Sequence, residues 1–205
     1  MKKYFISGIG TDVGKTVVSA VLTEALQADY WKPVQCGFAE GTDSGNVKKL
    51  ISNLTSVFHK EAYLLKEPAS PHIAAAKKNI RIEKSNIQLP VTNNNLIIEG
   101  AGGLLVPLNE KEYVIELAQQ FDAAVVLVIS YYLGCINHSL LSIDYLLSHN
   151  YKIQGLIFNG NFDEGVLTAI KNYKDLPVLA EIPGAKQIDK NFVSEQAAKI
   201  NVNQF

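Results

Sequence analysis

Short apolar runs recur along the chain, and several are apolar at consecutive positions rather than at alternate ones. Consecutive apolar residues indicate strands that are buried on both faces, which is typical of a parallel sheet. We therefore predict a buried sheet built from the runs 3–7, 30–34, 95–99, 124–129, 153–159 and 177–182.

Between these runs, apolar residues recur three or four positions apart, as they do on one face of a helix. Segment 14–28 carries such a stripe, which consists of Val18, Val21, Leu22, Ala25 and Leu26. Segments 112–121 and 137–150 have the same pattern, and 190–205 predicts one more helix followed by a loose end. Strands that alternate with helices favour βαβ units with right-handed crossovers.

No internal repeat, Gly/Ser linker or charge block divides the sequence. We expect a single α/β domain over residues 1–205, doubly wound, with a mostly parallel sheet and helices on both faces. The length of 205 residues suits one domain of generous size.

The charge composition argues against binding to nucleic acid or to an anionic membrane. The formal net charge is only -1, so no strong electrostatic attraction to either is expected. Arg81 is the only arginine. Lysine must therefore carry any cationic role in a phosphate site.

Cysteine usage and the apolar runs bear on the compartment. Cys36 and Cys135 are far apart and form no metal-ligand spacing, which favours a reducing compartment. The first residues have lysines but no long apolar core, so they do not predict a signal peptide. The longest apolar run, 123–129, is too short to span a bilayer. We expect a cytoplasmic protein.

The stretch "GIGTDVGKT" (8–16) nearly matches the phosphate-binding loop, in which a Gly, four free positions and Gly-Lys-Ser/Thr follow one another. Ile9 stands where the first Gly is expected, with glycines on both sides. A predicted strand precedes the stretch and a predicted helix begins at its end, as the loop requires. The context favours a P-loop NTPase over a chance Gly-Lys-Thr in a turn.

The stretch "NLIIEGAGG" (95–103) places an acid, Glu99, where an apolar strand is expected to end. P-loop enzymes need such an acid to hold Mg²⁺ or its water, and ligands of open α/β sheets bind at that edge. The glycines that follow allow the backbone to approach a ligand closely. The alternative is a solvated Glu in a tight turn.

Six stretches in this order resemble the dethiobiotin synthetase family: "GIGTDVGKT", "WKPVQCG", "TDSGNV", "EPASPHIAA", "IEGAGGLLVPL" and "LGCINHSLL". The resemblance runs from about residue 3 to about residue 185. In this family five residues separate the first Gly of the loop from the second, as they separate Gly8 from Gly14 here. The loop is therefore similar to a family variant.

The resemblance implies an ATP-dependent ligase of biotin synthesis. Its substrates are ATP, CO₂ and 7,8-diaminopelargonic acid. One amine takes up CO₂ as a carbamate, and the carbamate oxygen attacks the γ-phosphate to give a carbamic-phosphoric anhydride. The second amine then attacks the carbonyl carbon, the ureido ring closes, and phosphate leaves in addition to ADP.

The resemblance also implies roles for particular residues. Catalytic roles fall to Lys15, Lys32 and Thr11, and Mg²⁺ is expected at Thr16, Asp43 and Glu99. Without the resemblance, Lys32 could be a surface lysine and Asp43 part of a polar loop. The residues expected to bind ATP are Asp12, Val13, Gly14, Lys15, Thr16, Val17, Asp43, Glu99, Gly100, Ala101, Gly102, Asn159, Gly160, Pro183, Gly184 and Ala185.

The resemblance further implies that Cys36 contacts the diamine substrate, where relatives commonly have Ser or Thr; a small buried hydrophobe is the alternative. Because Lys32 is expected nearby, we predict a lowered thiol pKa and a reactive Cys36. The carboxylate tail of the substrate is expected across a homodimer interface, at a helix start that consists of Gly134, Cys135, Ile136 and Asn137. An uneventful helix cap is the alternative.

Three other kinds of protein compete with this interpretation. A P-loop ATPase switch of the partitioning type shares the loop style, but such switches carry an additional lysine where Gly10 stands here. An amidotransferase of cofactor synthesis would need a glutaminase domain, for which 205 residues leave no room. A nucleotide-binding scaffold without catalysis also remains open.

Overall fold

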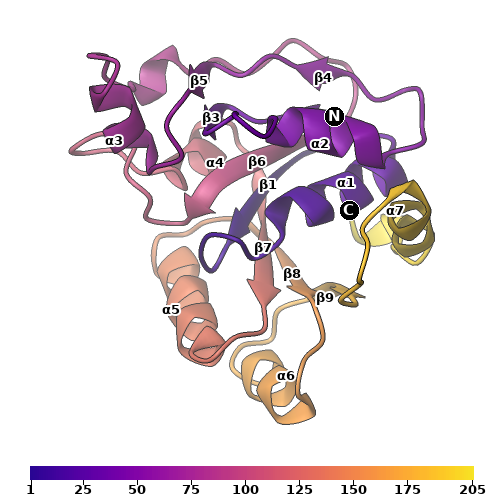
Figure 1. The fold of residues 1–205 in the computed structure, drawn as a ribbon. Helices are drawn as coiled ribbons and strands as arrows, with labels where there is room; N and C mark the ends of the chain where they lie inside the picture. Colours follow the sequence, from indigo (N-terminus) through magenta and orange to yellow (C-terminus); the bar gives the residue numbers. More distant parts are fainter.

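A computed structural model describes residues 1–205. Seven strands form its main sheet: β1 (Lys3–Gly8), β2 (Asp29–Trp31), β4 (Phe58–His59), β6 (Leu96–Gly103), β7 (Ala124–Ser130), β8 (Ile153–Asn159) and β9 (Val178–Ile182). They lie in the order β4-β2-β6-β1-β7-β8-β9, and every pair is parallel (Figure 1). The predicted parallel sheet is confirmed.

Helices cover both faces of the sheet, as the doubly wound prediction requires. One face carries the mutually packed helices α1 (Lys15–Leu26), α2 (Asp43–Leu50) and α7 (Lys190–Ala197) (Figure 1). Because the chain moves the other way along the sheet after β6, right-handed crossovers place the next helices on the opposite face. These helices are α4 (Glu116–Gln120), α5 (Cys135–Ser148) and α6 (Glu164–Lys171).

The covering helices explain why the strands are apolar at consecutive positions. In β7, residues 125–129 are fully buried on both sides of the sheet. In α1, the predicted stripe faces the sheet through Val18, Val21 and Leu22, which are fully buried. The buried apolar residues form one contiguous cluster.

The predicted strand 30–34 is wrong in one respect, because the chain changes sheets within it. The strand β2 ends at Trp31, and Pro33, which has no N–H to donate, precedes a separate strand. That strand, β3 (Val34–Cys36), pairs only with β5 (Tyr63–Leu65) in a second, two-stranded parallel sheet. Helix α3 (Pro71–Ala76) packs against this small sheet.

The pattern did not predict α2, and it gave the wrong picture of the C-terminal segment. Only Val47 of α2 is buried, so the helix has almost no apolar stripe. The segment after α7 is not loose, since Phe205 is buried and its ring lies 5.3 Å from that of Tyr4.

Two 3₁₀ turns, Lys84–Asn86 and Val202–Gln204, complete the elements. No helix has the length and apolar character needed to cross a membrane.

The sheet brings two distant parts of the sequence together at one edge. β1 pairs with β6 so that Ile6 lies opposite Glu99, and a register shift then brings Gly8 opposite Gly103. Glu99 does not end its strand as expected, because β6 continues through the glycine-rich segment. The phosphate loop and the acid nevertheless meet where ligands of open α/β sheets bind.

Candidate active site

The loop between β1 and α1 accounts for Ile9 in place of glycine. The side chain of Ile9 is buried, and its N–H donates to the Val128 carbonyl oxygen at 3.1 Å, extending the contact between β1 and β7. Gly8 is the position at which the loop has no room for a side chain. A Cβ there would lie 2.5 Å from Val13 Cγ2 and 3.3 Å from Lys15 Nζ. The tight position of the loop is therefore Gly8.

Gly14 begins α1 in a left-handed conformation with φ of 86°. A Cβ at this position would lie 2.0 Å from Asn159 Nδ2, so no other residue fits without displacing that side chain. Asn159, at the end of β8, donates through Nδ2 to the Val13 carbonyl oxygen at 3.1 Å. The structure thus joins two segments that were expected to bind ATP.

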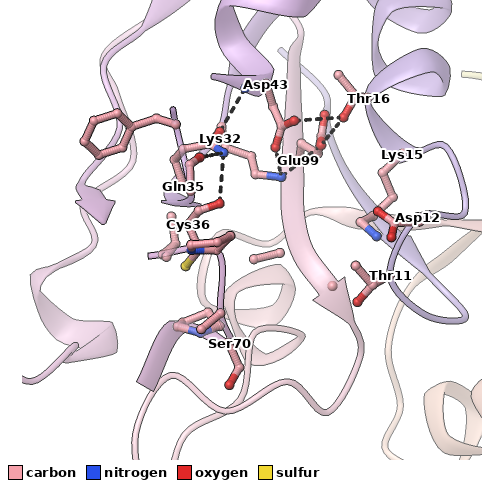
Figure 2. A pocket seen from close by; sticks show the side chains of 18 of the residues that line it. Thr11, Asp12, Lys15, Thr16, Lys32, Gln35, Cys36, Asp43, Ser70 and Glu99 are labelled. Carbon is pink, nitrogen blue, oxygen red and sulfur yellow. Dashed lines mark hydrogen bonds and ion pairs between the residues drawn. The ribbon is translucent and has the colours of Figure 1, made fainter. Parts of the chain in front are cut away.

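A cluster of two lysines, two carboxylates and one hydroxyl lies beside the loop (Figure 2). The Lys32 ammonium lies 2.7 Å from Asp43 Oδ2 and 2.9 Å from Glu99 Oε1. The Thr16 hydroxyl lies within hydrogen-bond distance of the same carboxylates, 3.0 Å from Glu99 Oε1 and 3.2 Å from Asp43 Oδ1. Lys15 donates to the Gly10 carbonyl oxygen at 2.9 Å.

The two lysines differ in their electrostatic environment. Burial disfavours the charged form of Lys32, but the negative charges of Glu99 and Asp43 outweigh burial and raise its pKa. Burial, reinforced by the positive charge of Lys32, lowers the pKa of Lys15 to about 8. Both ammonium groups are predominantly charged at neutral pH, and Lys15 titrates first as the pH rises.

Tyr30 also belongs to this cluster, although no feature of the sequence led us to expect it. Its hydroxyl donates to Glu99 Oε2 at 2.9 Å. Burial, together with the negative charge of Glu99, raises the pKa of Tyr30 well above its ordinary value, so the hydroxyl remains protonated. The available signal was spacing: Tyr30 stands two positions before Lys32, on the same side of an extended segment.

The position of Asp43 depends on a short buried link. Asp43 is the first residue of α2, where the Thr42 hydroxyl caps the helix by accepting from the Gly45 N–H at 3.0 Å. The Asp43 N–H donates to Gln35 Oε1 at 2.9 Å, and Gln35 Nε2 donates to the Gly37 carbonyl oxygen at the same distance. Helix α2 and the small sheet therefore orient the Asp43 carboxylate together.

The donor set suits a hard divalent cation. Three oxygen donors, on Thr16, Asp43 and Glu99, converge on one place, and the ammonium of Lys32 occupies a position bounded by both carboxylates. Mg²⁺ prefers oxygen ligands and retains several waters, so a few side chains suffice. The residues present therefore fit the metal expected from the sequence.

A cavity of about 1050 Å³ opens beside the cluster. Cys36 and Ser70 lie on the side of this cavity across from Thr11 and Asp12 (Figure 2). The residues expected at the site that line it are Thr11, Asp12, Gly14, Lys15, Thr16, Lys32, Cys36, Asp43, Glu99, Ala101 and Gly102.

The predicted lowering of the Cys36 thiol pKa is wrong. Burial raises the pKa of its thiol to about 11, and the positive charge of Lys32 offsets this only in part. Burial of the thiol is therefore the larger of the two opposing effects. The sequence indicated that a lysine lies near the thiol, but it did not show that the thiol is buried.

Several residues expected at the site lie outside this cavity. Segments 159–160 and 183–185, at the ends of β8 and β9, form a separate group beside the loop. The Gly160 N–H donates to the Ile182 carbonyl oxygen at 2.8 Å, and the Gly184 N–H donates to Asn161 Oδ1 at 3.0 Å. Those outside the cavity are Val13, Val17, Gly100, Asn159, Gly160, Pro183, Gly184, Ala185, Gly134, Cys135, Ile136 and Asn137.

Solved structures with a similar fold include ATPases of the ParA and MinD types. The ParA family ATPase from Chlorobium tepidum superposes with a TM-score of 0.59 at 10% identity, covering 97% of this chain and 99% of its own. The septum site-determining protein MinD from Pyrococcus horikoshii gives 0.57 at 16% identity, covering 98% and 89%. Such identities establish the fold alone, and fold and loop together define a P-loop NTPase.

Sequence comparison then gives the family. The model of the AAA domain family matches residues 2–191. The ATP-dependent dethiobiotin synthetase BioD of Cytophaga hutchinsonii is 48% identical over the whole of both chains. That of Christiangramia forsetii is 50% identical over 97% of this chain and 95% of its own. The chain belongs to the dethiobiotin synthetase family, and the resemblance noted in its motifs is confirmed.

Proposed function

We propose that this protein, as one ATP-binding domain over residues 1–205, catalyses closure of the ureido ring of dethiobiotin. The substrates are 7,8-diaminopelargonic acid, CO₂ and ATP, and the other products are ADP and phosphate. Family membership over the full length of the chain carries the proposal. The two buried lysines beside a large cavity support it, because phosphoryl transfer needs positioned positive charge.

In the proposed reaction, one amine of the diamine adds to CO₂ and loses a proton, giving a carbamate. A carbamate oxygen attacks the γ-phosphorus, and the bond to the bridging oxygen of ADP breaks. The second amine then attacks the carbonyl carbon of the mixed anhydride and loses a proton as phosphate leaves. No covalent bond to the protein forms, so the protein acts by positioning and by electrostatic stabilisation.

The two lysines have different tasks in this scheme. Lys15, within the loop, binds the β- and γ-phosphates of ATP. Lys32 stands across the cluster and neutralises the charge that develops between the γ-phosphate and the carbamate. Thr11, at the crest of the loop and on the wall of the cavity, assists at the γ-phosphate. Its hydroxyl can donate or accept a hydrogen bond.

Thr16, Asp43 and Glu99 would hold Mg²⁺ through their oxygens. When bound, the ion would neutralise phosphate charge during transfer. The convergence of these three side chains supports the assignment. The positive ends of the loop amides and of α1 complete the phosphate site.

We assign the adenine base of ATP to segments 159–160 and 183–185, which lie outside the cavity. Asn159 ends β8 and Gly160 follows it, and Pro183–Ala185 follow β9, so both segments lie at the edge of the sheet where the loop lies. Backbone and amide groups there can read the adenine edge. The contact of Asn159 with the loop supports this assignment, because it joins the base site to the phosphate site.

We assign the carboxylate tail of the diamine to the start of α5 in a second subunit. In the same chain, residues 134–137 do not line the cavity. Leu133 is fully exposed beside them, and Tyr131 and Leu141 are more than half exposed. An apolar surface next to a helix start supports a homodimer in which the site is shared between two chains.

The test is an assay with Mg-ATP and bicarbonate, carried out with and without diaminopelargonate. We expect ADP release to depend on the diamine, and one dethiobiotin, identified by mass spectrometry, to form for each ADP. ADP release that ignores the diamine would instead favour the partitioning type of ATPase switch.

A further inference from the structure

Tyr30 contacts Glu99 from the side that faces away from the cavity. Its ring is fully buried, lies 5.5 Å from that of Phe58 and does not line the cavity. Its hydroxyl donates to Glu99 Oε2 at 2.9 Å. The other side chains that contact Glu99, those of Thr16 and Lys32, both line the cavity. Tyr30 is therefore the partner of Glu99 that lies behind the site.

The register of the sheet produces this contact. Tyr30 pairs with Ile97, and Glu99 lies two residues further along β6, so that Ile97 and Glu99 share a face of the sheet. A diagonal neighbour on the next strand is within reach of a long aromatic side chain. The phenol thus bonds to the carboxylate while its ring remains in the core.

We propose, on the basis of the metal-binding role proposed above for Glu99, that Tyr30 is a positioning residue for that carboxylate. By holding Oε2, the phenol leaves Oε1 as the oxygen that faces Thr16, Lys32 and the cavity. Glu99 then presents one fixed oxygen to the metal. Tyr30 itself touches neither metal nor substrate.

Loss of the phenol would have two effects at Glu99. The terminal torsion of a Glu side chain has a broad energy profile, so the carboxylate could rotate once Oε2 is free. The freed oxygen, in a residue that is only 1% exposed, would also lack a partner. Partners behind a ligating carboxylate typically contribute 10–100-fold to metal affinity.

The test compares Tyr30→Phe with Tyr4→Phe. Tyr4 is a matched control, because it is also buried in the main sheet and its hydroxyl has no partner. Mn²⁺ binding to the complex with ADP is measured by electron paramagnetic resonance, and ADP binding is measured in the presence of EDTA. For Tyr30→Phe we expect about 10-fold weaker Mn²⁺ binding. ADP binding in EDTA should remain as in the parent.

The same variants are assayed for ADP release. For Tyr30→Phe, the half-saturating Mg²⁺ concentration should rise by a larger factor than the rate at saturating Mg²⁺ falls. Tyr4→Phe should match the parent in every measurement. If Tyr30→Phe binds Mn²⁺ as the parent does, or if both variants weaken it equally, the positioning role is overturned.

Glu99→Gln separates this inference from the proposed function. If Glu99→Gln weakens Mn²⁺ binding while Tyr30→Phe does not, only the role of Tyr30 fails. If Glu99→Gln binds Mn²⁺ as the parent does, the metal-binding role of Glu99 fails, and the inference fails with it.

Discussion

The charge state of a buried side chain at the site depends on whether it has an ionic partner in direct contact. Lys32 is 4% exposed and nevertheless retains its charge, because two carboxylates lie within 3 Å of its ammonium. Lys15 and Cys36 have no ionic partner at such short distance. Burial therefore lowers the pKa of Lys15 to about 8 and raises that of the Cys36 thiol to about 11, whereas the pKa of Lys32 is raised by its carboxylate partners.

Lys15→Gln and Lys32→Gln should fail in different ways. Lys15 is expected to contact the nucleotide before and during transfer, so its loss should reduce both ADP affinity and rate. Lys32 should matter mainly as charge develops, so its loss should reduce the rate by about 10²–10³-fold with little effect on ADP binding. Calorimetric titration with ADP and steady-state kinetics measure the two effects. Equal losses of affinity and rate in both variants would contradict this division.

Cys36 should be unreactive at neutral pH. Its thiol pKa is raised to about 11, so the thiolate at pH 8 is roughly 10²-fold scarcer than in a free cysteine, and alkylation should be slower by that factor. The rate with iodoacetamide should rise steadily between about pH 8 and 10, the range below the raised pKa. Cys36→Ser serves as control for labelling at Cys135. A rate at pH 8 close to that of a free thiol would refute the effect of burial.

Which residues the structure brings together at the candidate site was largely predictable from the sequence, because it depends on residue types in fixed local contexts. A Gly-Lys-Thr step between strand and helix, and an acid on an apolar strand, identified Lys15, Thr16 and Glu99. The spacing of Tyr30 from Lys32 was not enough to predict its contact with Glu99, because that contact depends on the register between β2 and β6, which are more than sixty residues apart in the chain. Burial of Cys36 depends on tertiary packing in the same way.

At the scale of elements, Asp29 joins the start of β2 to the segments that flank it. The buried carboxylate accepts from the Val57 N–H at 3.0 Å, Thr92 Oγ1 at 2.6 Å and Asn94 Nδ2 at 3.1 Å, and His59 Nε2 lies at 3.1 Å. These contacts connect β2 with β4 and with the polar turn before β6. Asp29 lies at the opposite end of its strand from Lys32.

Asp29→Asn should destabilise the fold by about 1–3 kcal/mol at pH 7, because a side-chain amide nitrogen cannot accept from Thr92. Burial alone would raise the pKa of Asp29, but the hydrogen bonds, foremost that from Thr92, lower it below its ordinary value. The folded carboxyl therefore binds fewer protons than the unfolded one. Its contribution to stability is present above about pH 4 and is lost as the pH falls through the lowered folded pKa.

Urea unfolding at pH 7 and at about pH 3 measures this contribution, and the difference between parent and Asp29→Asn should shrink at the lower pH. Asp122→Asn is the control, because Asp122 is an exposed partner of Lys152 and should contribute little at either pH. A difference between parent and Asp29→Asn that does not change with pH would show that the charge of Asp29 is not involved.

Apolar patterns predicted elements well where burial was extensive and poorly where it was not. β7 and β8 were predicted to within a residue at either end because helices cover both of their faces. The two-residue β4 and the polar α2 have too little buried surface to leave a pattern. The division of 30–34 between two sheets required knowledge of what each half pairs with.

At the scale of the whole molecule, the shared-site hypothesis predicts complementation between two inactive variants. Lys32→Gln removes a cation from one segment, and Asn137→Glu places a negative charge beside the substrate tail. Asn137 is preferable to Gly134, whose φ of 102° would strain any side chain, and acids are tolerated in the first turn of a helix.

Each variant alone should be nearly inactive. After unfolding and refolding together, half of the dimers should be mixed, and each mixed dimer should have one intact site. About a quarter of the parental activity should therefore return. Mass spectrometry of the intact dimers checks subunit exchange. If exchange is complete and no activity returns, both segments serve the same site from one chain.

The position of β1 in the sheet has a consequence for synthesis on the ribosome. β1 is made first, yet its two neighbours are β6 and β7, which end at residues 103 and 130. Until those residues emerge, both edges of an apolar strand lack their native partners, and such edges favour association between nascent chains. The phosphate loop thus acquires its final shape only after translation has passed residue 130.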